Sequence, residues 1–408
     1  MEVTTTPKVI LKIDLRNAFN SLRRDKILAA VRENIPEAFS FFYQAYSAES
    51  LLIYGQTTLA SATGLQQGDP AGPALFSLTI DDLIKSLTAE LNTWFLYDGT
   101  MGDSVDKVLG DLDTLLAGFP ELGADLHGDT CELSTLNCTE EQQAQIIQAF
   151  QLRLPTIKII PSEQLDLLGS PLQDAGVPRM LQEKKESLER LCSRLEEIEA
   201  HPALILLKNC FSLPKLMYIL RTSTAFKFPE ELMAIDDFIR QTLTRITNVD
   251  IDNESWREAH LPVWFGGLGI RTSEHLAASA FLASHYATEG LVERILAPIQ
   301  LDRRPSPDGA MGCWSRRVPE SDPPDNKSKQ KAWDEPVCHA EFNELLANAD
   351  QVARAQLLAA RTEDSGAWLH APPPPPLEHT WMLSACASLS RSVWGHPSAS
   401  HTVVVAGQ

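Results

Sequence analysis

The chain has 408 residues, 44% of them hydrophobic, and a formal net charge of −19, which allows two or three domains with cores of their own. The acidic balance excludes a nucleic-acid binder that works by bulk positive charge, since phosphate contacts need lysine and arginine, but it is compatible with a local basic groove. Seven scattered cysteines without a CxxC pair, and no apparent signal peptide or transmembrane segment, predict an intracellular protein, nuclear or cytoplasmic, with free thiols.

Short strands and helices are expected to alternate in the first part of the chain. Residues 9–15 form an apolar, roughly alternating run, which predicts a core strand with Asp14 at its C-terminal end. The next expected elements are a helix with Ser21 as its N-cap, a helix opened by Pro36 and a hairpin around Gly55.

A loop rich in glycine and proline and a second hairpin come next. The loop covers residues 64–73 and leads into a helix expected over 74–91. The run 94–97 then ends in Asp98-Gly99, which predicts a strand that enters a tight turn. A helix is expected over 105–116, and short strands over 156–160 and 165–168.

Beyond residue 178 the hydrophobic period becomes helical, so this part of the chain predicts an all-α module. Residues 302–331 are rich in proline, serine and charged residues, which predicts a disordered linker. The run Pro372–Pro376 predicts polyproline II. The helices are expected over 180–198, 201–220, 229–246, 273–296 and, as one or two helices, 341–361.

Two carboxylates of the first part are placed for metal chemistry. Asp14 ends one strand and Asp98 follows another, and carboxylates from neighbouring strands can hold Mg²⁺ in phosphoryl-transfer sites. Each residue also has a simpler explanation: Asp14 as a cap, Asp98 as a turn residue, Gly68 as part of an ordinary loop and Phe19 as a core residue.

Four segments resemble, in the right order, the palm motifs of reverse transcriptases. KIDLRNAFNSL resembles the first motif, GLQQGDPAGPALFSL the second, WFLYDGT the catalytic hairpin and LLGSPL, at residues 167–172, the primer-grip strands. The later segment LPVWFGGLGIRTSEHLAASAFLAS is similar to the thumb region of reverse transcriptases from non-LTR retrotransposons. The resemblance runs from about Val9 to Leu369.

This resemblance implies an α+β fold, with a partial polymerase palm made of a small antiparallel sheet with helices, followed by an all-α thumb and C-terminal helices. The chain begins almost at the first motif, so the fingers are expected to be missing, and the tail after Ala371 departs from the family as a shifted reading frame would. The implied domains are a palm over 1–177, a helical thumb and connection over 178–300, a disordered linker over 301–335, a short helical segment over 336–371, and a polyproline and disordered tail over 372–408.

The same resemblance implies roles for individual residues. Asp14 and Asp98 would be catalytic ligands of Mg²⁺, Phe19 would lie beneath the sugar of the incoming nucleotide, and Gln67 with Gly68 would lie along the template. The implied partners are an RNA template, a DNA primer and deoxynucleotides.

Departures from the family pattern predict a disabled enzyme. The family's hairpin carries two adjacent aspartates, and Tyr97 stands in the position of the metal-binding one; a neutral phenol is a poor ligand for Mg²⁺. Thr130 replaces a lysine expected to protonate the leaving pyrophosphate. The expected function is that of a reverse transcriptase domain-containing protein, inactive as it stands. The alternatives are a non-catalytic nucleic-acid-binding fragment and an interaction protein whose Pro372–Pro376 run binds SH3- or WW-type modules.

Overall fold

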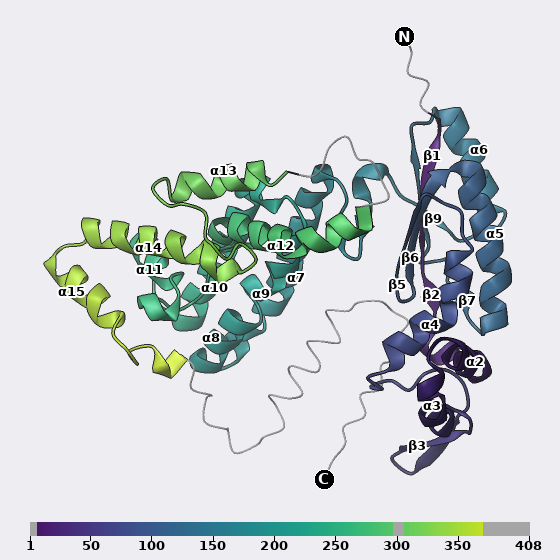
Figure 1. The fold of residues 1–408 in the computed structure, drawn as a ribbon. Helices are drawn as coiled ribbons and strands as arrows, with labels where there is room; N and C mark the ends of the chain where they lie inside the picture. Colours follow the sequence, from purple (N-terminus) through teal and green to yellow (C-terminus); the bar gives the residue numbers. More distant parts are fainter. Residues whose placement is uncertain (1–5, 297–305, 370–408) are drawn as a thin grey trace. The chain divides into compact units, whose positions relative to one another are not determined.

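The computed structural model describes residues 6–296 and 306–369 and divides the chain into two compact units, residues 1–168 and 169–408 (Figure 1). The division falls at residue 168 rather than at the expected 177. Unit 1 mixes strands and helices, and the described part of unit 2 is almost entirely helical, so the expected α+β fold class is confirmed. The run Pro372–Pro376 and the tail after Ala371 lie outside the described residues.

Unit 1 is built on a five-stranded sheet with the order β5-β6-β1-β8-β9. The central β1 is antiparallel to β6 and to β8, and only β9 runs parallel to its neighbour. Every second residue of β1 is buried, and α5 and α6 cover this apolar face of the sheet (Figure 1). The strands are β1 (Lys8–Ile13), β5 (Leu91–Phe95), β6 (Asp98–Ser104), β8 (Glu132–Leu136) and β9 (Lys158–Ile159); the helices are α5 (Val105–Leu122) and α6 (Glu140–Gln151).

Smaller elements of unit 1 surround the end of β1 at which Asp14 lies. A buried Arg24 holds several of them together, because its guanidinium donates to the carbonyls of Gly64 and Ala48 and to the hydroxyl of Ser61. The elements are β2 (Leu15–Arg16), α1 (Ala18–Ser21), α2 (Arg24–Asn34), α3 (Phe39–Tyr46), the hairpin β3 (Ser50–Tyr54) and β4 (Thr57–Ser61), α4 (Gly72–Lys85) and β7 (Asp125–Leu126). A short hairpin of β10 (Asp166–Leu167) and β11 (Ser170–Pro171) marks the division between the units.

Several boundaries in unit 1 differ from the sequence-based expectation. Ser21 ends α1 and does not cap α2, and the helix expected to reach residue 91 ends at Lys85. The elements β8 and α6 were not expected, although a capping box of Thr139 and Gln142 opens α6 and was visible in the sequence. The tight turn lies at Leu96-Tyr97, so Asp98 is the first residue of β6 and not a turn residue.

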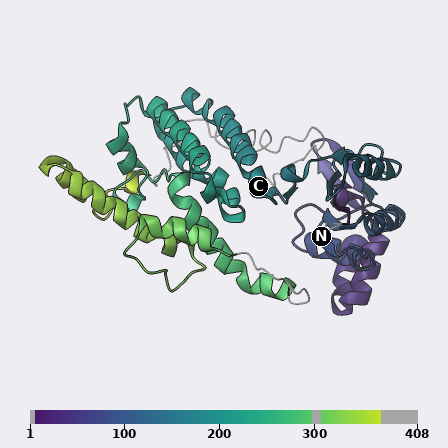
Figure 2. The ribbon, with the colours of Figure 1, turned by 90° about the horizontal axis from the view of Figure 1, so that it is seen from above.

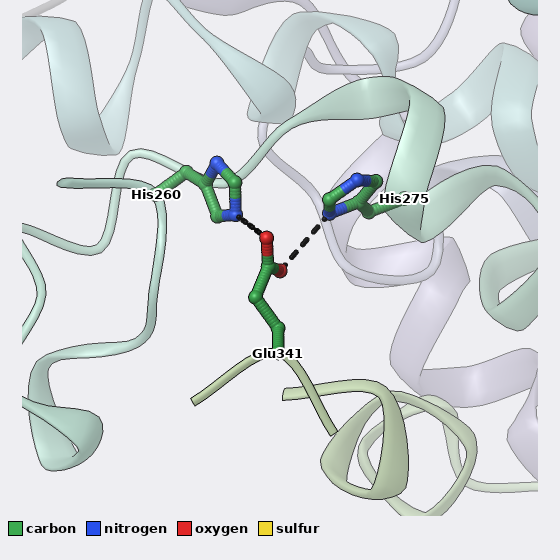
Figure 3. Close-up of side chains that lie close together, drawn as sticks. All are labelled: His260, His275 and Glu341. Carbon is green, nitrogen blue, oxygen red and sulfur yellow. Dashed lines mark ion pairs between the residues drawn. The ribbon is translucent and has the colours of Figure 1, made fainter. Parts of the chain in front are cut away.

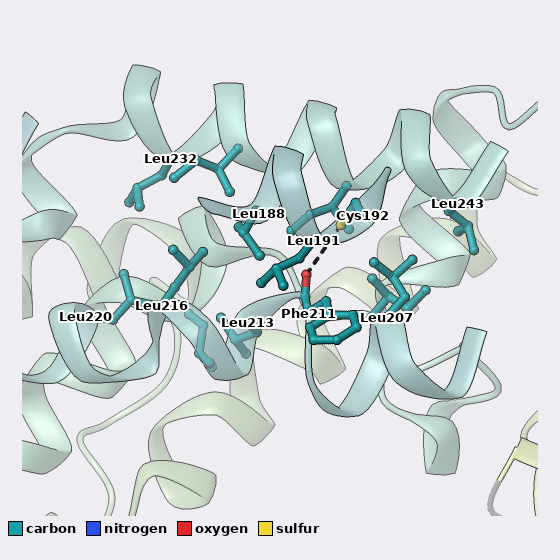
Figure 4. Close-up of a cluster of buried hydrophobic side chains, with 14 of the residues drawn as sticks. Leu188, Leu191, Cys192, Leu207, Phe211, Leu213, Leu216, Leu220, Leu232 and Leu243 are labelled. Carbon is teal, nitrogen blue, oxygen red and sulfur yellow. Dashed lines mark hydrogen bonds between the residues drawn. The ribbon is translucent and has the colours of Figure 1, made fainter. Parts of the chain in front are cut away.

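The helices of unit 2 pack around α12, which contacts α9, α10, α13 and α14 (Figures 1 and 2). Leucines from α7, α8, α9 and α10 contribute to the main core cluster of unit 2, in which the Cys192 thiol lies 3.9 Å from the carbonyl oxygen of Phe211 (Figure 4). The helices are α7 (Val177–Cys192), α8 (Ala200–Asn209), α9 (Leu213–Thr222), α10 (Pro229–Thr247), α11 (Asn253–Ala259), α12 (Ser273–Leu296), α13 (Asp308–Arg317), α14 (Gln330–Asn348) and α15 (Gln351–Ala360).

One stretch of unit 2, residues 200–222, has the length and the apolar composition of a membrane span, which corrects the expectation that no such stretch exists. The structure divides it into α8 and α9, and 56% of the apolar window is buried inside the protein. Leu204, Leu207 and Leu216 of this stretch belong to the core cluster. Packing inside the unit therefore accounts for its composition.

The expectation of a disordered linker over 301–335 is wrong for most of the described part of this range. Residues 308–317 form α13, and α14 already begins at Gln330. Trp314 and Trp333 are both fully buried; the Trp314 indole donates to the Trp333 carbonyl at 2.8 Å, and the two rings meet edge to face. The two tryptophan side chains thus bury a large apolar area, although most residues of this range are polar.

The buried position of Trp314 leads to a test of this correction. Trp314→Ala is expected to lower the free energy of unfolding by about 3–5 kcal/mol, because it leaves a cavity and removes a buried hydrogen bond. Urea unfolding followed by circular dichroism measures the change. Trp368→Ala is the control, since Trp368 is 51% exposed. If the two variants unfold alike, residues 308–335 do not pack as described.

Candidate active site

The two expected catalytic carboxylates lie close together at one end of the β1–β6 pair. Ile13, the last residue of β1, stands opposite Gly99; Asp14 follows Ile13, and Asp98 is the first residue of β6, close enough for the charge of Asp14 to act on it. Both aspartates are half-buried. Gly99 has no room for a side chain, because a Cβ atom there would lie 2.5 Å from the Trp94 ring. This glycine therefore lets the hairpin close beside the acidic pair.

Burial and the neighbouring carboxylate of Asp14 raise the pKa of Asp98, and the charge of Lys12 partly opposes this shift. Tyr97 lies in the turn just before Asp98, after Leu96 with its left-handed φ of 58°. Burial, followed by the charges of Asp98 and Asp14, raises the pKa of the Tyr97 phenol. The residue in the expected ligand position is therefore neutral at physiological pH.

Further polar side chains, which sequence reasoning missed as partners, lie around the two acids. The Thr130 hydroxyl donates to Asp14 Oδ2 at 2.6 Å, and His127 Nδ1 lies 3.8 Å from the same oxygen. Lys12 bridges Glu132 and Asp166 at 2.5 and 2.6 Å. Burial alone would lower the pKa of Lys12, but the hydrogen bonds to these two carboxylates raise it. Period-two alternation could have identified Lys12, because residues two apart on a strand share a face with Asp14.

Phe19 lies directly beside the acidic hairpin. Its ring stacks on Phe76 of α4 with the ring centroids 5.0 Å apart, and it meets the Tyr97 ring edge to face at 6.1 Å. The phenylalanine is half-buried, so part of its surface is available to a ligand. The structure therefore brings Phe19, Tyr97, Asp98 and Asp14 together.

The loop with Gln67 and Gly68 is anchored near Phe19 and exposed at its tip. The backbone N–H of Leu65 donates to the carbonyl of Phe19 at 2.7 Å. Asp69 accepts hydrogen bonds from the Tyr46 hydroxyl and from the backbone N–H of Ala71, and burial together with this contact raises the pKa of Tyr46 to about 12. Gln67 and Gly68 are both exposed. Gly68 has a φ of 93°, which only glycine adopts freely, and a Cβ built there would touch nothing within 4 Å.

The acidic pair offers two oxygen ligands for a metal ion. Carboxylates suit a hard cation such as Mg²⁺, which is commonly held by one or two of them. In the described part of the chain, no third carboxylate, histidine or thiol joins Asp14 and Asp98 at the spacing of a metal site. The donors therefore fit a Mg²⁺ ion, but the set is smaller than the one the family motif predicts, because Tyr97 adds a neutral oxygen.

The comparison with protein families points to the same region. A family model described as reverse transcriptase (RNA-dependent DNA polymerase) matches residues 1–101. This range contains Asp14, Phe19, Gln67, Gly68 and the Tyr97-Asp98 hairpin. No curated protein matches the chain. Residues 1–101 are thus similar to a reverse transcriptase domain, a family that works on nucleic-acid templates and primers and in general uses divalent metal ions.

The burial of Asp98 and its repulsion from Asp14 together predict a pH-dependent gain in stability when Asp98 is neutralised. Because the folded state raises the pKa of Asp98, its contribution to stability is complete below the unfolded value, about 3.9, and is lost as the pH rises through the folded value. Asp98→Asn should therefore raise the free energy of unfolding near pH 7, by about 0.5–1 kcal/mol for a charge pair with solvent access, and leave it unchanged near pH 3.5.

Urea titrations at the two pH values measure this difference. Asp129→Asn is the matched control, because the Asp129 side chain is 64% exposed. An Asp98→Asn variant that is less stable than the parent at pH 7 would show that the two carboxylates do not repel each other.

Proposed function

We propose that unit 1 is the palm of a reverse transcriptase that derives from a non-LTR retrotransposon, and that its metal site is too weak for DNA synthesis. The observation that carries the proposal is the proximity of Asp14, which follows β1, and Asp98, the first residue of β6, beside Phe19 and Tyr97. Two motif segments that lie far apart in the sequence, one with Asp14 and Phe19 and the other with Tyr97 and Asp98, converge at this place. The match of residues 1–101 to the reverse transcriptase family supports the assignment.

The chain's own residues would then have separate tasks in binding. Asp14 and Asp98 would hold Mg²⁺, which when bound activates the primer 3′-hydroxyl and neutralises the triphosphate. Phe19 would form an apolar floor under the sugar of the nucleotide, where its bulk disfavours a 2′-hydroxyl. The exposed backbone at Gly68, next to Gln67, would let a template strand approach closely.

The loss of activity follows from the same residues. Phosphoryl transfer depends on preorganised charge at the reacting phosphate, and Tyr97 supplies none. Without metal, the like charges of Asp14 and Asp98 oppose each other, so part of any binding energy offsets this repulsion. The Thr130 hydroxyl stands where a lysine is expected and already donates to Asp14, so it brings no positive charge to a leaving pyrophosphate.

Primer extension tests the proposal directly. The purified chain, given a primed RNA template, deoxynucleotides and Mg²⁺, should extend the primer at background level, because the metal site lacks a carboxylate. Tyr97→Asp should tighten metal binding about tenfold. It should not restore primer extension, since Thr130 cannot act as the cationic proton donor that a lysine would provide. Tyr97→Asn, which is neutral, is the control for metal binding. Robust extension by the unmodified chain that disappears in Asp14→Asn would overturn the inactivity proposed here.

Nucleic-acid binding without catalysis is the second candidate, and the exposed loop around Gly68 favours it. Because the net charge is −19, such binding has to come from a local surface. We expect RNA affinity that falls with salt along a shallow slope, as for a few phosphate contacts, when it is measured by fluorescence anisotropy between 50 and 200 mM salt. If RNA does not bind even at 50 mM salt, unit 1 does not retain the template surface of a polymerase.

A further inference from the structure

Two histidines and a glutamate from separate segments converge in unit 2. His260 follows the end of α11, His275 lies in the first turns of α12, and Glu341 lies in α14 (Figure 3). One ligand atom from each of the three lies within 4.8 Å of the others. The cluster thus joins the end of α11 to α12 and to α14, which is far from both in the sequence.

The spacing within this cluster is that of metal ligands. His260 Nε2 lies 2.8 Å from Glu341 Oε1, and His275 Nδ1 lies 3.2 Å from Glu341 Oε2 (Figure 3). Ligand atoms of a tetrahedral zinc ion lie roughly 3.3 Å apart, given Zn–N and Zn–O bonds of about 2.0–2.1 Å. Two histidines and one glutamate are also a common ligand set for zinc sites that keep a fourth position open.

The environment of the His260 ring favours a bound ligand. The residue is 2% exposed, and its Nδ1 has no hydrogen-bond partner among the described residues. Its Nε2 lies 2.8 Å from Glu341 Oε1. An unpaired polar group costs free energy when it is buried, and a metal ion that bound one of these nitrogens would offset that cost.

The surroundings are those of a metal-binding histidine. His275 Nε2, the nitrogen turned away from Glu341, lies 3.5 Å from Glu274 Oε2, and Glu274 is itself paired with Arg317. A carboxylate on the far nitrogen orients such a ligand and makes it more basic.

A pocket of about 690 Å³ adjoins the cluster, and His260, His275 and Glu341 form part of its wall. Asp236 lines the same pocket, but its carboxylate is occupied, because it accepts hydrogen bonds from the backbone N–H groups of Ser273 and Glu274 at the start of α12. The cluster therefore has three ligands of its own and space beside them for a water molecule.

We propose that His260, His275 and Glu341 bind one divalent transition-metal ion, zinc foremost, with a water molecule from the pocket in the fourth position. The competing explanation is a purely ionic cluster in which Glu341 balances the histidines and Arg257, whose Nε lies 3.7 Å from Glu341 Oε1. That explanation pairs His260 Nε2 with Glu341 Oε1 and leaves His260 Nδ1 without a partner. It also assigns no role to the ligand-like spacing of the three side chains beside a pocket.

Calorimetric titration of the full chain, first treated with a chelator, tests the proposal with zinc alone. We expect one tight site per chain, and a zinc affinity about 100-fold weaker or more in His275→Gln and in Glu341→Gln. The matched controls are His339→Gln and Glu344→Gln, because both residues are exposed positions of the same helix, α14. Both controls should bind zinc like the parent chain.

Cobalt(II) provides a second measurement, which does not depend on the variants folding. In the parent chain it should give the visible absorption of a four-coordinate site with nitrogen and oxygen ligands, without the charge-transfer band of a thiolate. The proposal is overturned if the chain has no stoichiometric zinc site, if the cobalt spectrum shows thiolate ligands, or if folded His275→Gln and Glu341→Gln variants bind zinc like the parent.

Discussion

The antiparallel register of β1 on β6 is the constraint on which the candidate active site depends. Val9, Leu11 and Ile13 of β1 are buried, and a slip by one residue would turn them to the other face of the sheet. The same register places Ile13 opposite Gly99, and therefore brings Asp14 and Asp98, the residues next to this pair, to the same end of the two strands. Core packing therefore fixes the position of the acids, and it does so whether or not the site is still active.

This dependence explains how the hairpin can keep its geometry without a carboxylate at position 97. Tyr97 lies in the turn and contacts Phe19 edge to face, so its aromatic ring contributes packing in the place of a metal ligand. Thr130 likewise contributes a hydrogen bond to Asp14 where the family motif predicts a lysine. Both contacts stabilise the folded unit in the absence of a metal ion. The two carboxylates of Asp14 and Asp98 by themselves would be stabilised by a bound metal ion.

The sequence predicted a strand that ends near Asp14, a hairpin near Asp98 and the helical second unit, because hydrophobic period and motif order are local signals. It did not predict the contact of Thr130 with Asp14, since these residues are 116 positions apart and only the folded sheet joins them. The prediction of a disordered linker was wrong because it used the average composition of the segment. The structure of the segment is determined by two of its residues, Trp314 and Trp333, which are buried. The cluster of His260, His275 and Glu341 has no common motif, so only the packing of three helices reveals it.

The number of divalent ions that unit 1 binds tests the central claim most directly. Titration with Mn²⁺, followed by electron paramagnetic resonance, counts them in a Glu341→Gln background that weakens the cluster of unit 2. The account predicts at most one weakly bound ion, which is lost in Asp14→Asn, because two carboxylates and a neutral phenol hold one hard cation. Two ions bound at this site by the chain with Tyr97 in place would contradict the account.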